Sequence, residues 1–341
     1  MEHYSKENPH GWTGRRLRVD LHAENGIFLL PAGHPLTVED VEKVMRHRIV
    51  LTDSEFEPLS KQDLALQALE QSVEMIERMF EDVRLGGSIP IMDIRTEVLP
   101  AIVQSTEQLQ VSSLLVSMQA RDDYTYRHTI AVGALSSMIG RWLKLPENEQ
   151  AILTMGAMLH DVGKMRIPEH ILNKKDKLSD EEFEIMKQHT VYGYQLIQEC
   201  KVLDWRSALI ALQHHEREDG SGYPFGVTGE MIDPLSKIVA IADVFHALTS
   251  DRTYRNASPF YEILHKMYTG NLGIFDTNIL LLFTRRLMDG LIGCKVELTD
   301  GRIGRVVLIP PMDPTRPLIQ TDDGFVDLGK ENGIYMEQII E

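Results

Sequence analysis

An adjacent pair of histidines, His214 and His215, stands directly before a glycine-containing loop that ends in Tyr223 and Pro224. Neutral imidazoles are the commonest metal ligands in proteins, and glycines let a backbone approach a bound ligand closely. A histidine pair alone carries little weight, but the chain contains other possible ligands. These are His128, the dyad His160-Asp161, His189 and Asp243. The set predicts metal chemistry beside a binding loop.

The chain has 341 residues and a formal net charge of −16. This length allows two or three domains with at least one sizeable core. The negative charge argues against general affinity for nucleic acid or for an anionic membrane, since both attract basic surfaces. Two cysteines, Cys200 and Cys294, lie far apart and outside any CxxC motif, and no apolar run approaches a membrane span. We therefore expect a cytoplasmic protein without a disulfide framework or signal peptide.

Residues 1–58 predict a small mixed α/β module with an accessory or regulatory role. Leu17, Val19 and Leu21 alternate with polar residues, as in a half-buried strand. Asn25-Gly26 is a hairpin signal before a returning strand, and a capping-box pattern then opens a helix.

Residues 59–119 predict a helical linker. Its apolar residues recur at alternating spacings of three and four, which is an a/d seam of about three heptads. The seam consists of Leu66, Leu69, Val73, Ile76, Phe80 and Val83. It is compatible with a homodimer contact through residues 61–83 and equally with one helix packed on its neighbours. A second helix is expected after Pro100, which suits a first turn.

Residues 120–290 show mostly helical patterns. An apolar helical face runs up to His160, a capping box at Ser179 opens a helix expected to carry His189, and a further apolar helix carries Asp243. Residues 291–341 switch to strand periodicity around two Asp-Gly turns, which predicts a small β-barrel-like module. The chain is thus expected to be mainly α.

The dyad is followed by Val162-Gly163-Lys164, so the segment reads HDVGK. An aspartate has two carboxylate oxygens, and it can bridge two cations about 3.5–4 Å apart, as two-metal hydrolases require. In a helix, Lys164 would share a face with His160 and Asp161. There it could hold a phosphate oxygen or protonate a leaving oxygen. Asp161 and Lys164 are therefore the candidate catalytic residues.

Three more motifs surround the remaining candidates: YTYRH ending at His128, MKQH ending at His189, and ALTSDRTYR from Ala247 to Arg255. With HDVGK and the GYP loop, these resemble the HD-GYP branch of the HD superfamily, whose members hydrolyse cyclic di-GMP. The corresponding family patterns are YTYxH, MKxH, ALTSDRPYR and HD(I/V)GK. The resemblance covers roughly residues 120–290 and implies an HD-type helical bundle that carries the metal centre.

The resemblance also implies two metal sites that share one aspartate. The first would consist of His128, His160, Asp161 and Asp243, and the second of Asp161, His189, His214 and His215. Mixed imidazole and carboxylate ligands suit iron, manganese, zinc or nickel, and the family favours iron or manganese. The implied substrate contacts are Lys164, Tyr223, Arg252 and Arg255, since arginine is well shaped for phosphate.

Three residues depart from the family pattern. Tyr124 occupies a position where some members have a glutamate that helps to hold a third metal, so a two-metal centre is expected. Thr253 replaces a proline that would stiffen its loop. His246 replaces an aspartate one helical turn after Asp243. This replacement either changes the surroundings of the metal ligands or is a harmless change on the surface.

The sequence thus predicts a metal-dependent phosphodiesterase that converts cyclic di-GMP to linear pGpG, with onward hydrolysis to GMP left open. One alternative substrate is another cyclic dinucleotide, such as cyclic GMP-AMP. The other alternative is a catalytically weak sensor that binds cyclic di-GMP and signals through its flanking modules. The complete set of ligands favours an enzyme. Metal identity, the stimulus of the N-terminal module and the oligomeric state do not follow from the sequence.

Overall fold

The computed structural model of this chain describes residues 12, 15–23, 26–34, 36–109, 111, 113–114, 124–250, 260–270, 273–331 and 333–340. The chain divides into two compact units, Met1–Leu64 and Ala65–Glu341. Each unit has a buried apolar core of its own. Most of the described chain is helical, as the sequence predicted.

The first unit combines a short antiparallel hairpin with one helix. Its elements are β1 (Leu21–His22), β2 (Phe28–Leu30), α1 (Val38–Arg46) and the short 3-10 helix η2 (Asp53–Glu55). The predicted capping box is present at Thr37. Leu17 and Leu21 are buried, but Val19 is 55% exposed because the chain bends there instead of continuing as a strand. The expected alternation was therefore wrong at Val19.

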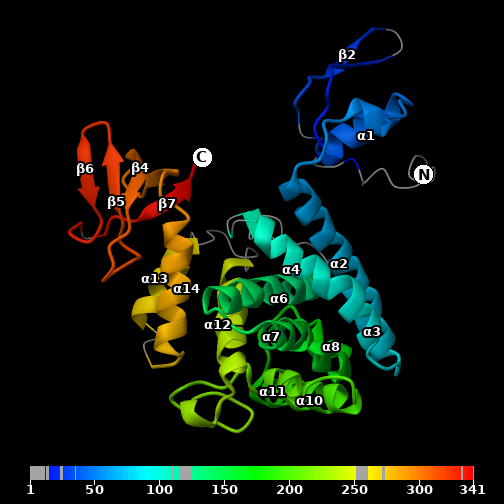
Figure 1. Cartoon of the computed structure of the whole chain (residues 1–341), viewed down its shortest axis with the longest axis vertical. Helices are drawn as coiled ribbons and strands as arrows, with labels where there is room; N and C mark the ends of the chain where they lie inside the picture. Colours follow the sequence, from blue (N-terminus) through cyan, green and yellow to red (C-terminus); the bar gives the residue numbers. More distant parts are fainter. Residues whose placement is uncertain are drawn as a thin grey trace. The chain divides into compact units, whose positions relative to one another are not determined.

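Helix α2 (Lys61–Arg84) leads into the second unit, which is mainly helical. The following elements are α3 (Ile91–Asp93), the π-helix η3 (Ile94–Val98), α4 (Leu99–Gln108), α6 (Tyr124–Trp142), α7 (Glu147–Leu159), η4 (Val162–Arg166), α8 (Glu169–Leu172), α9 (Asp180–Lys187), α10 (His189–Glu199), α11 (Trp205–Gln213), η5 (Gly229–Met231), α12 (Pro234–Ser250), α13 (Phe260–Gly270) and α14 (Thr277–Asp289). Figure 1 shows α6, α7, α10, α11 and α12 gathered in one part of this unit. These helices, with the segments that join them, bear the candidate ligands.

The seam of α2 is buried within the chain itself. Leu69, Ile76 and Phe80 are each at most 1% exposed and belong to the same apolar core as residues of α6 and α7. Polar contacts reinforce this packing, since Arg127 of α6 forms an ion pair with Glu70 of α2 at 2.8 Å. Intrachain packing therefore accounts for the seam, and a homodimer through residues 61–83 stays a prediction.

The end of the chain forms a five-stranded antiparallel sheet in the order β6-β5-β4-β3-β7. The strands are β3 (Lys295–Leu298), β4 (Ile303–Leu308), β5 (Leu318–Thr321), β6 (Gly324–Asp327) and β7 (Met336–Ile339). Gly301 (φ +83°) and Gly324 (φ +132°) take the left-handed conformations that the two predicted Asp-Gly turns require. A hydrogen bond of 2.6 Å between Nδ1 of His265 in α13 and Oγ1 of Thr315 ties this region to the helices.

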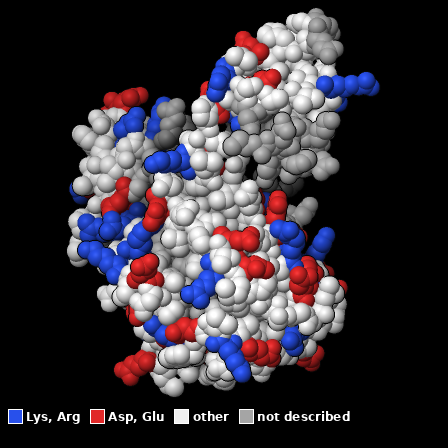
Figure 2. Space-filling model, turned by 45° about the vertical axis from the view of Figure 1, so that its right-hand side comes forward, with Lys and Arg blue, Asp and Glu red and all other residues white. Residues whose placement is uncertain are grey.

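Acidic and basic side chains are interspersed over much of the face that Figure 2 shows. The acidic side chains that give the net charge of −16 are therefore mixed with basic ones and do not gather in one acidic area of that face. No helix in the described part of the chain combines the length and hydropathy that a bilayer span requires.

Candidate metal centre

Helix ends and helix faces from distant parts of the chain bring the candidate ligands together. His128 lies in α6, His160 and Asp161 join α7 to η4, and His189 is the first residue of α10. His214 and His215 follow the last residue of α11, and Asp243 lies in α12. All except the partly buried His215 have less than a tenth of their surface exposed. Buried polar groups of this kind need partners, because burial without them is unfavourable.

One group of ligand atoms lies between α6, α7 and α12. Nε2 of His128 is 3.0 Å from Oδ1 of Asp243, and Nε2 of His160 is 4.0 Å from the same oxygen. These three atoms lie within 4.8 Å of one another, close enough to hold one ion. These three residues are among the four that the resemblance assigned to the first site.

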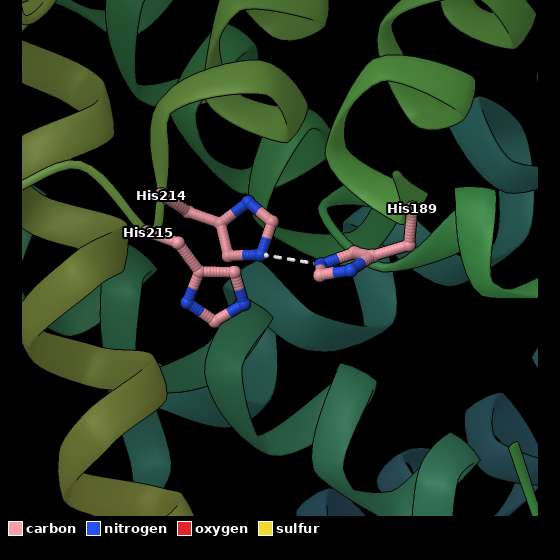
Figure 3. Close-up of side chains that lie close together, drawn as sticks. All are labelled: His189, His214 and His215. Atoms are coloured by element: carbon pink, nitrogen blue, oxygen red, sulfur yellow. Dashed lines mark hydrogen bonds between the residues drawn. The ribbon is translucent and has the colours of Figure 1, made fainter. Parts of the chain in front are cut away.

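A second group contains His189, His214 and His215, whose rings point toward one another in Figure 3. The dashed line there joins Nε2 of His189 to Nε2 of His214, which are 3.3 Å apart. Two nitrogens that each lie about 2.1 Å from one ion are separated by about 3.0–3.4 Å when the angle is between square and tetrahedral. The observed spacing therefore suits a shared cation.

Asp161 lies between the two groups and presents one oxygen to each. Its Oδ2 is 3.1 Å from Nε2 of His160 and 3.8 Å from Nε2 of His128. Its Oδ1 is 3.4 Å from Nε2 of His189 and 3.9 Å from Nε2 of His214. A carboxylate placed in this way can bridge two cations.

The backbone determines which nitrogen of three rings faces the centre. Nδ1 of His160, His189 and His214 lies 2.6, 2.7 and 2.9 Å from the carbonyl oxygens of Ala157, Met186 and Ala211. A carbonyl oxygen only accepts, so Nδ1 carries the hydrogen, and in the neutral ring Nε2 keeps a lone pair. Metal-binding histidines are usually oriented by this kind of bond.

Those lone pairs face other electron-rich atoms. Nε2 of His160 and Oδ1 of Asp161 are buried and have no hydrogen-bond partner among the described residues. Lone pairs at 3.1–3.4 Å repel unless a cation lies between them. The residues present therefore fit metal ions, as does the chemistry of the donor set.

The charge states of most of these groups also suit cations. Burial lowers the pKa of His189 to about 4 and the pKa values of His214 and His215 well below their usual range, so these rings are neutral at neutral pH. Burial alone would raise the pKa of Asp161, but His160 and Lys164 outweigh it and hold that pKa well below its usual range. Neutral imidazoles and ionised carboxylates are the forms that bind metals. Burial would also lower the pKa of His160, but Asp161 raises it, so a proton competes with a cation for this ring.

A family model described as HD domain matches residues 103–279, which is more than half of the chain and includes every candidate ligand. The chain belongs to the HD domain family. A cyclic di-GMP phosphodiesterase of Pseudomonas aeruginosa is 35% identical over 67% of this chain and 55% of its own length. A 3′3′-cGAMP-specific phosphodiesterase of Vibrio cholerae is 35% identical over 50% of this chain and 41% of its own length. The chain thus spans about half the length of these relatives.

The fold of this HD domain also resembles a solved structure. It is that of an HDG"Y"P protein from Bdellovibrio bacteriovorus, with a TM-score of 0.55 and 20% sequence identity over 80% of this chain and 95% of that chain. The predicted resemblance to HD-GYP proteins is confirmed at the level of family and fold.

Two structural expectations for the HD domain were wrong in detail. The helix opened by the capping box at Ser179 ends at Lys187, and His189 begins the next helix instead of lying within the first. Lys164 lies in the 3-10 helix η4, not in a continuation of α7. The expected neighbourhood still results, because residues three apart are close in a 3-10 helix. Nζ of Lys164 lies 2.6 Å from Oδ2 of Asp161.

His246 is buried in the HD domain and is not a surface residue. It is 1% exposed, and its Nδ1 lies 2.9 Å from Nδ1 of His128. If Nδ1 of His128 donates, its Nε2 is left for the cluster, as in the other rings. The alternative of a harmless surface change is therefore excluded by burial.

Tyr223 lies over the metal centre, and a buried glutamate holds its loop. The ring of Tyr223 stacks on that of His215, with centroids 4.6 Å apart. Oε1 and Oε2 of Glu216 accept hydrogen bonds from the backbone amides of Phe225 and Val227 at 2.8 and 3.1 Å. Burial, with the nearby carboxylates, raises the pKa of Tyr223, so its phenol stays neutral at neutral pH.

The structure thus brings together every predicted metal ligand, Lys164 and Tyr223. Arg252, Arg255 and Thr253 lie outside the described residues, and so does the side chain of Tyr124. Sequence reasoning missed Glu216, which is 2% exposed although glutamate is rarely buried. Its only signal was its position directly after the histidine pair.

Proposed function

We propose that this chain is a metal-dependent phosphodiesterase that hydrolyses cyclic di-GMP to linear pGpG. The observation that carries the proposal is the placement of Asp161, whose two oxygens face different groups of histidine nitrogens. One carboxylate between two cations is an arrangement that two-metal hydrolases of phosphate esters use.

Two transition-metal ions are part of this proposal. The first would be held by His128, His160, Asp161 and Asp243, and the second by Asp161, His189, His214 and His215. Iron or manganese is favoured, and zinc or nickel is compatible with the same donors. When bound, the ions would supply positive charge beside a phosphoryl group and make water more acidic.

The side chains around the centre would bind and orient the substrate. Lys164 keeps Asp161 in place at 2.6 Å, and its side chain is 24% exposed, so the ammonium can also reach a phosphate oxygen or protonate the leaving 3′ oxygen. Tyr223 would form one wall of the site. Arg252 and Arg255 would contact the second phosphate of the cyclic dinucleotide.

The relatives support a cyclic dinucleotide as the substrate. Both kinds of relative occur among the matches, at the same 35% identity for one cyclic di-GMP phosphodiesterase and one 3′3′-cGAMP-specific phosphodiesterase. The HD-GYP motifs make cyclic di-GMP the first candidate, and cyclic GMP-AMP is the second.

The proposal extends to organisation and location. Residues 120–290 would carry catalysis, 59–119 would link, and 1–58 and 291–341 would act as accessory modules. Both cysteines are free thiols, which suits a reducing cytoplasm.

Turnover of a panel of cyclic dinucleotides by anaerobically purified, metal-assayed protein tests this function. We expect cyclic di-GMP to be cleaved with the highest kcat/KM. Faster cleavage of cyclic GMP-AMP would make that dinucleotide the proposed substrate, and the proposed type of reaction, phosphodiester hydrolysis, would stand. No cleavage of any cyclic dinucleotide by fully loaded protein would overturn the proposal.

A further inference from the structure

An aromatic ladder leads from the metal centre to the surface. Its inner step is the ring of His215, on which Tyr223 stacks at 4.6 Å and 29°. Its outer step is Phe183 of α9, whose ring meets that of Tyr223 edge-on, at 6.1 Å and 78°. Phe183 is 43% exposed.

The ammonium of Lys187 lies beside the outer ring, Phe183. Lys187 lies four residues after Phe183 on the same face of α9. Its Nζ lies 5.0 Å from the ring centroid of Phe183 and 5.7 Å from that of Tyr223. The same ammonium forms an ion pair with Glu184 at 2.6 Å, but this glutamate is 68% exposed, so water screens the pair.

An exposed aromatic ring beside a cation suits a nucleotide. Every base has a flat face that stacks on aromatic side chains, whatever its hydrogen-bonding edge, and an ammonium attracts phosphate oxygens. The ladder begins beside the metal centre, because the ring centroid of Tyr223 is 4.6 Å from that of His215 and 6.4 Å from that of His189. A phosphodiester at the centre would therefore have its attached nucleoside near this ladder.

We propose that the exposed ring of Phe183, with Tyr223 edge-on beside it, stacks on one base of the cyclic dinucleotide and that Lys187 draws the adjoining phosphate oxygens toward it. This inference rests on the proposed function and adds two substrate-binding residues, Phe183 and Lys187. Because stacking reads the face of a base and not its edge, the site favours purines of large area without choosing guanine over adenine. Choice between cyclic di-GMP and cyclic GMP-AMP then depends on other contacts.

The test is a comparison of Phe183 variants on two substrates. One substrate is cyclic di-GMP, and the other is an analogue of the same ring with both guanines replaced by stable abasic units. The measured ratio is kcat/KM for cyclic di-GMP divided by kcat/KM for the abasic analogue. We expect Phe183→Ala to lower this ratio about tenfold, mainly through a higher KM for cyclic di-GMP. Phe183→Tyr should restore the ratio, whereas Phe183→Leu, which keeps apolar bulk without a ring, should not.

The matched control is Ile185→Ala. Ile185 lies on the same helix and is 41% exposed, but residues two apart do not share a helix face. Its ratio should equal that of the wild type. Lys187→Ala should raise the KM for both substrates, because the analogue keeps its phosphates.

Two failures are distinguishable. An active wild type whose ratio is unchanged in both Phe183→Ala and Phe183→Leu would overturn the stacking site and leave the phosphodiesterase intact. A wild type that cleaves no cyclic dinucleotide would overturn the proposed function, and the stacking site with it. Circular dichroism and metal content are compared between each variant and the wild type to identify any variant that has misfolded. If Phe183→Ala misfolds, the ratio of Phe183→Leu is compared with that of Phe183→Tyr.

Discussion

The two groups of ligands in the metal centre differ in one histidine, since His128 of the first group is oriented by a side chain whereas His189 and His214 of the second are oriented by the backbone. In the second group, His189 and His214 each place Nδ1 near a backbone carbonyl of the preceding turn, at 2.7 and 2.9 Å. In the first group, His128 instead places Nδ1 2.9 Å from the side chain of His246, 118 residues further along the chain. His160 of the first group is oriented in the same way as His189 and His214, with Nδ1 2.6 Å from the backbone carbonyl of Ala157.

This difference determines which group can be altered by substitution. A backbone carbonyl is present whatever the side chain, so the orientation of His189 and His214 follows from the fold alone. The orientation of His128 depends on one replaceable side chain. The first group is therefore the part of the centre at which a single substitution outside the ligands can alter metal binding.

The largest effect is expected at the residue that joins the two groups. Asp161→Ala removes the carboxylate that both groups share, so both ions and hydrolysis should be lost to below detection. Arg252→Ala removes one charge-assisted phosphate contact worth about 1.5–3 kcal/mol, so it should cost about ten- to a hundredfold. Turnover of cyclic di-GMP by the two variants measures the contrast. Similar losses would mean that the catalytic centre lies elsewhere.

An intermediate effect is expected at His246, which tests the comparison directly. His246→Leu should weaken metal binding at the first group about 10–100-fold, because His128 loses the partner of its Nδ1. His246→Asn should retain most of the affinity, since an amide oxygen accepts the same hydrogen bond. Titration of each folded protein against a chelator gives the affinities. Equal values in wild type and both variants would show that His246 does not support the ligand.

The smallest effect concerns the product and depends on a third ion. By the resemblance to HD-GYP proteins, Tyr124 stands where some members have a glutamate that helps to hold such an ion, and a neutral phenol is a poor ligand. With one cation fewer, the terminal phosphate of pGpG is held less well while its internal linkage is attacked. We therefore expect pGpG to accumulate and GMP to appear slowly. An ion-exchange time course in which GMP rises from the start without pGpG would contradict this.

Much of the centre could be predicted from the sequence because its residues lie in short motifs. His160-Asp161 and His214-His215 are adjacent in the chain, and each remaining ligand has flanking residues that identify it. Helical periodicity placed most of these residues at helix ends or on helix faces. The break at Gln188 was missed, since MKQH has no proline or glycine to signal a helix end.

What the sequence did not predict are contacts between residues far apart in the chain. The hydrogen bond between His128 and His246 and the edge-on contact of Phe183 with Tyr223 have no local pattern. The seam of α2 shows the same limit, because an a/d repeat looks alike whether the partner is another chain or the same one. The burial of Leu69 and Ile76 in the apolar core that they share with α6 and α7, together with the ion pair between Glu70 and Arg127, identifies an intrachain partner.

The most direct test of the bridged centre is a count of metal ions per folded chain. Protein purified without oxygen, supplied with iron or manganese and freed of loosely bound metal should contain two ions per chain by elemental analysis. His189→Ala should retain about one ion, because all four residues of the first proposed site, His128, His160, Asp161 and Asp243, remain in place. One ion or none in the folded wild type would contradict the account, and three at equal occupancy would show that Tyr124 or another group serves as a ligand.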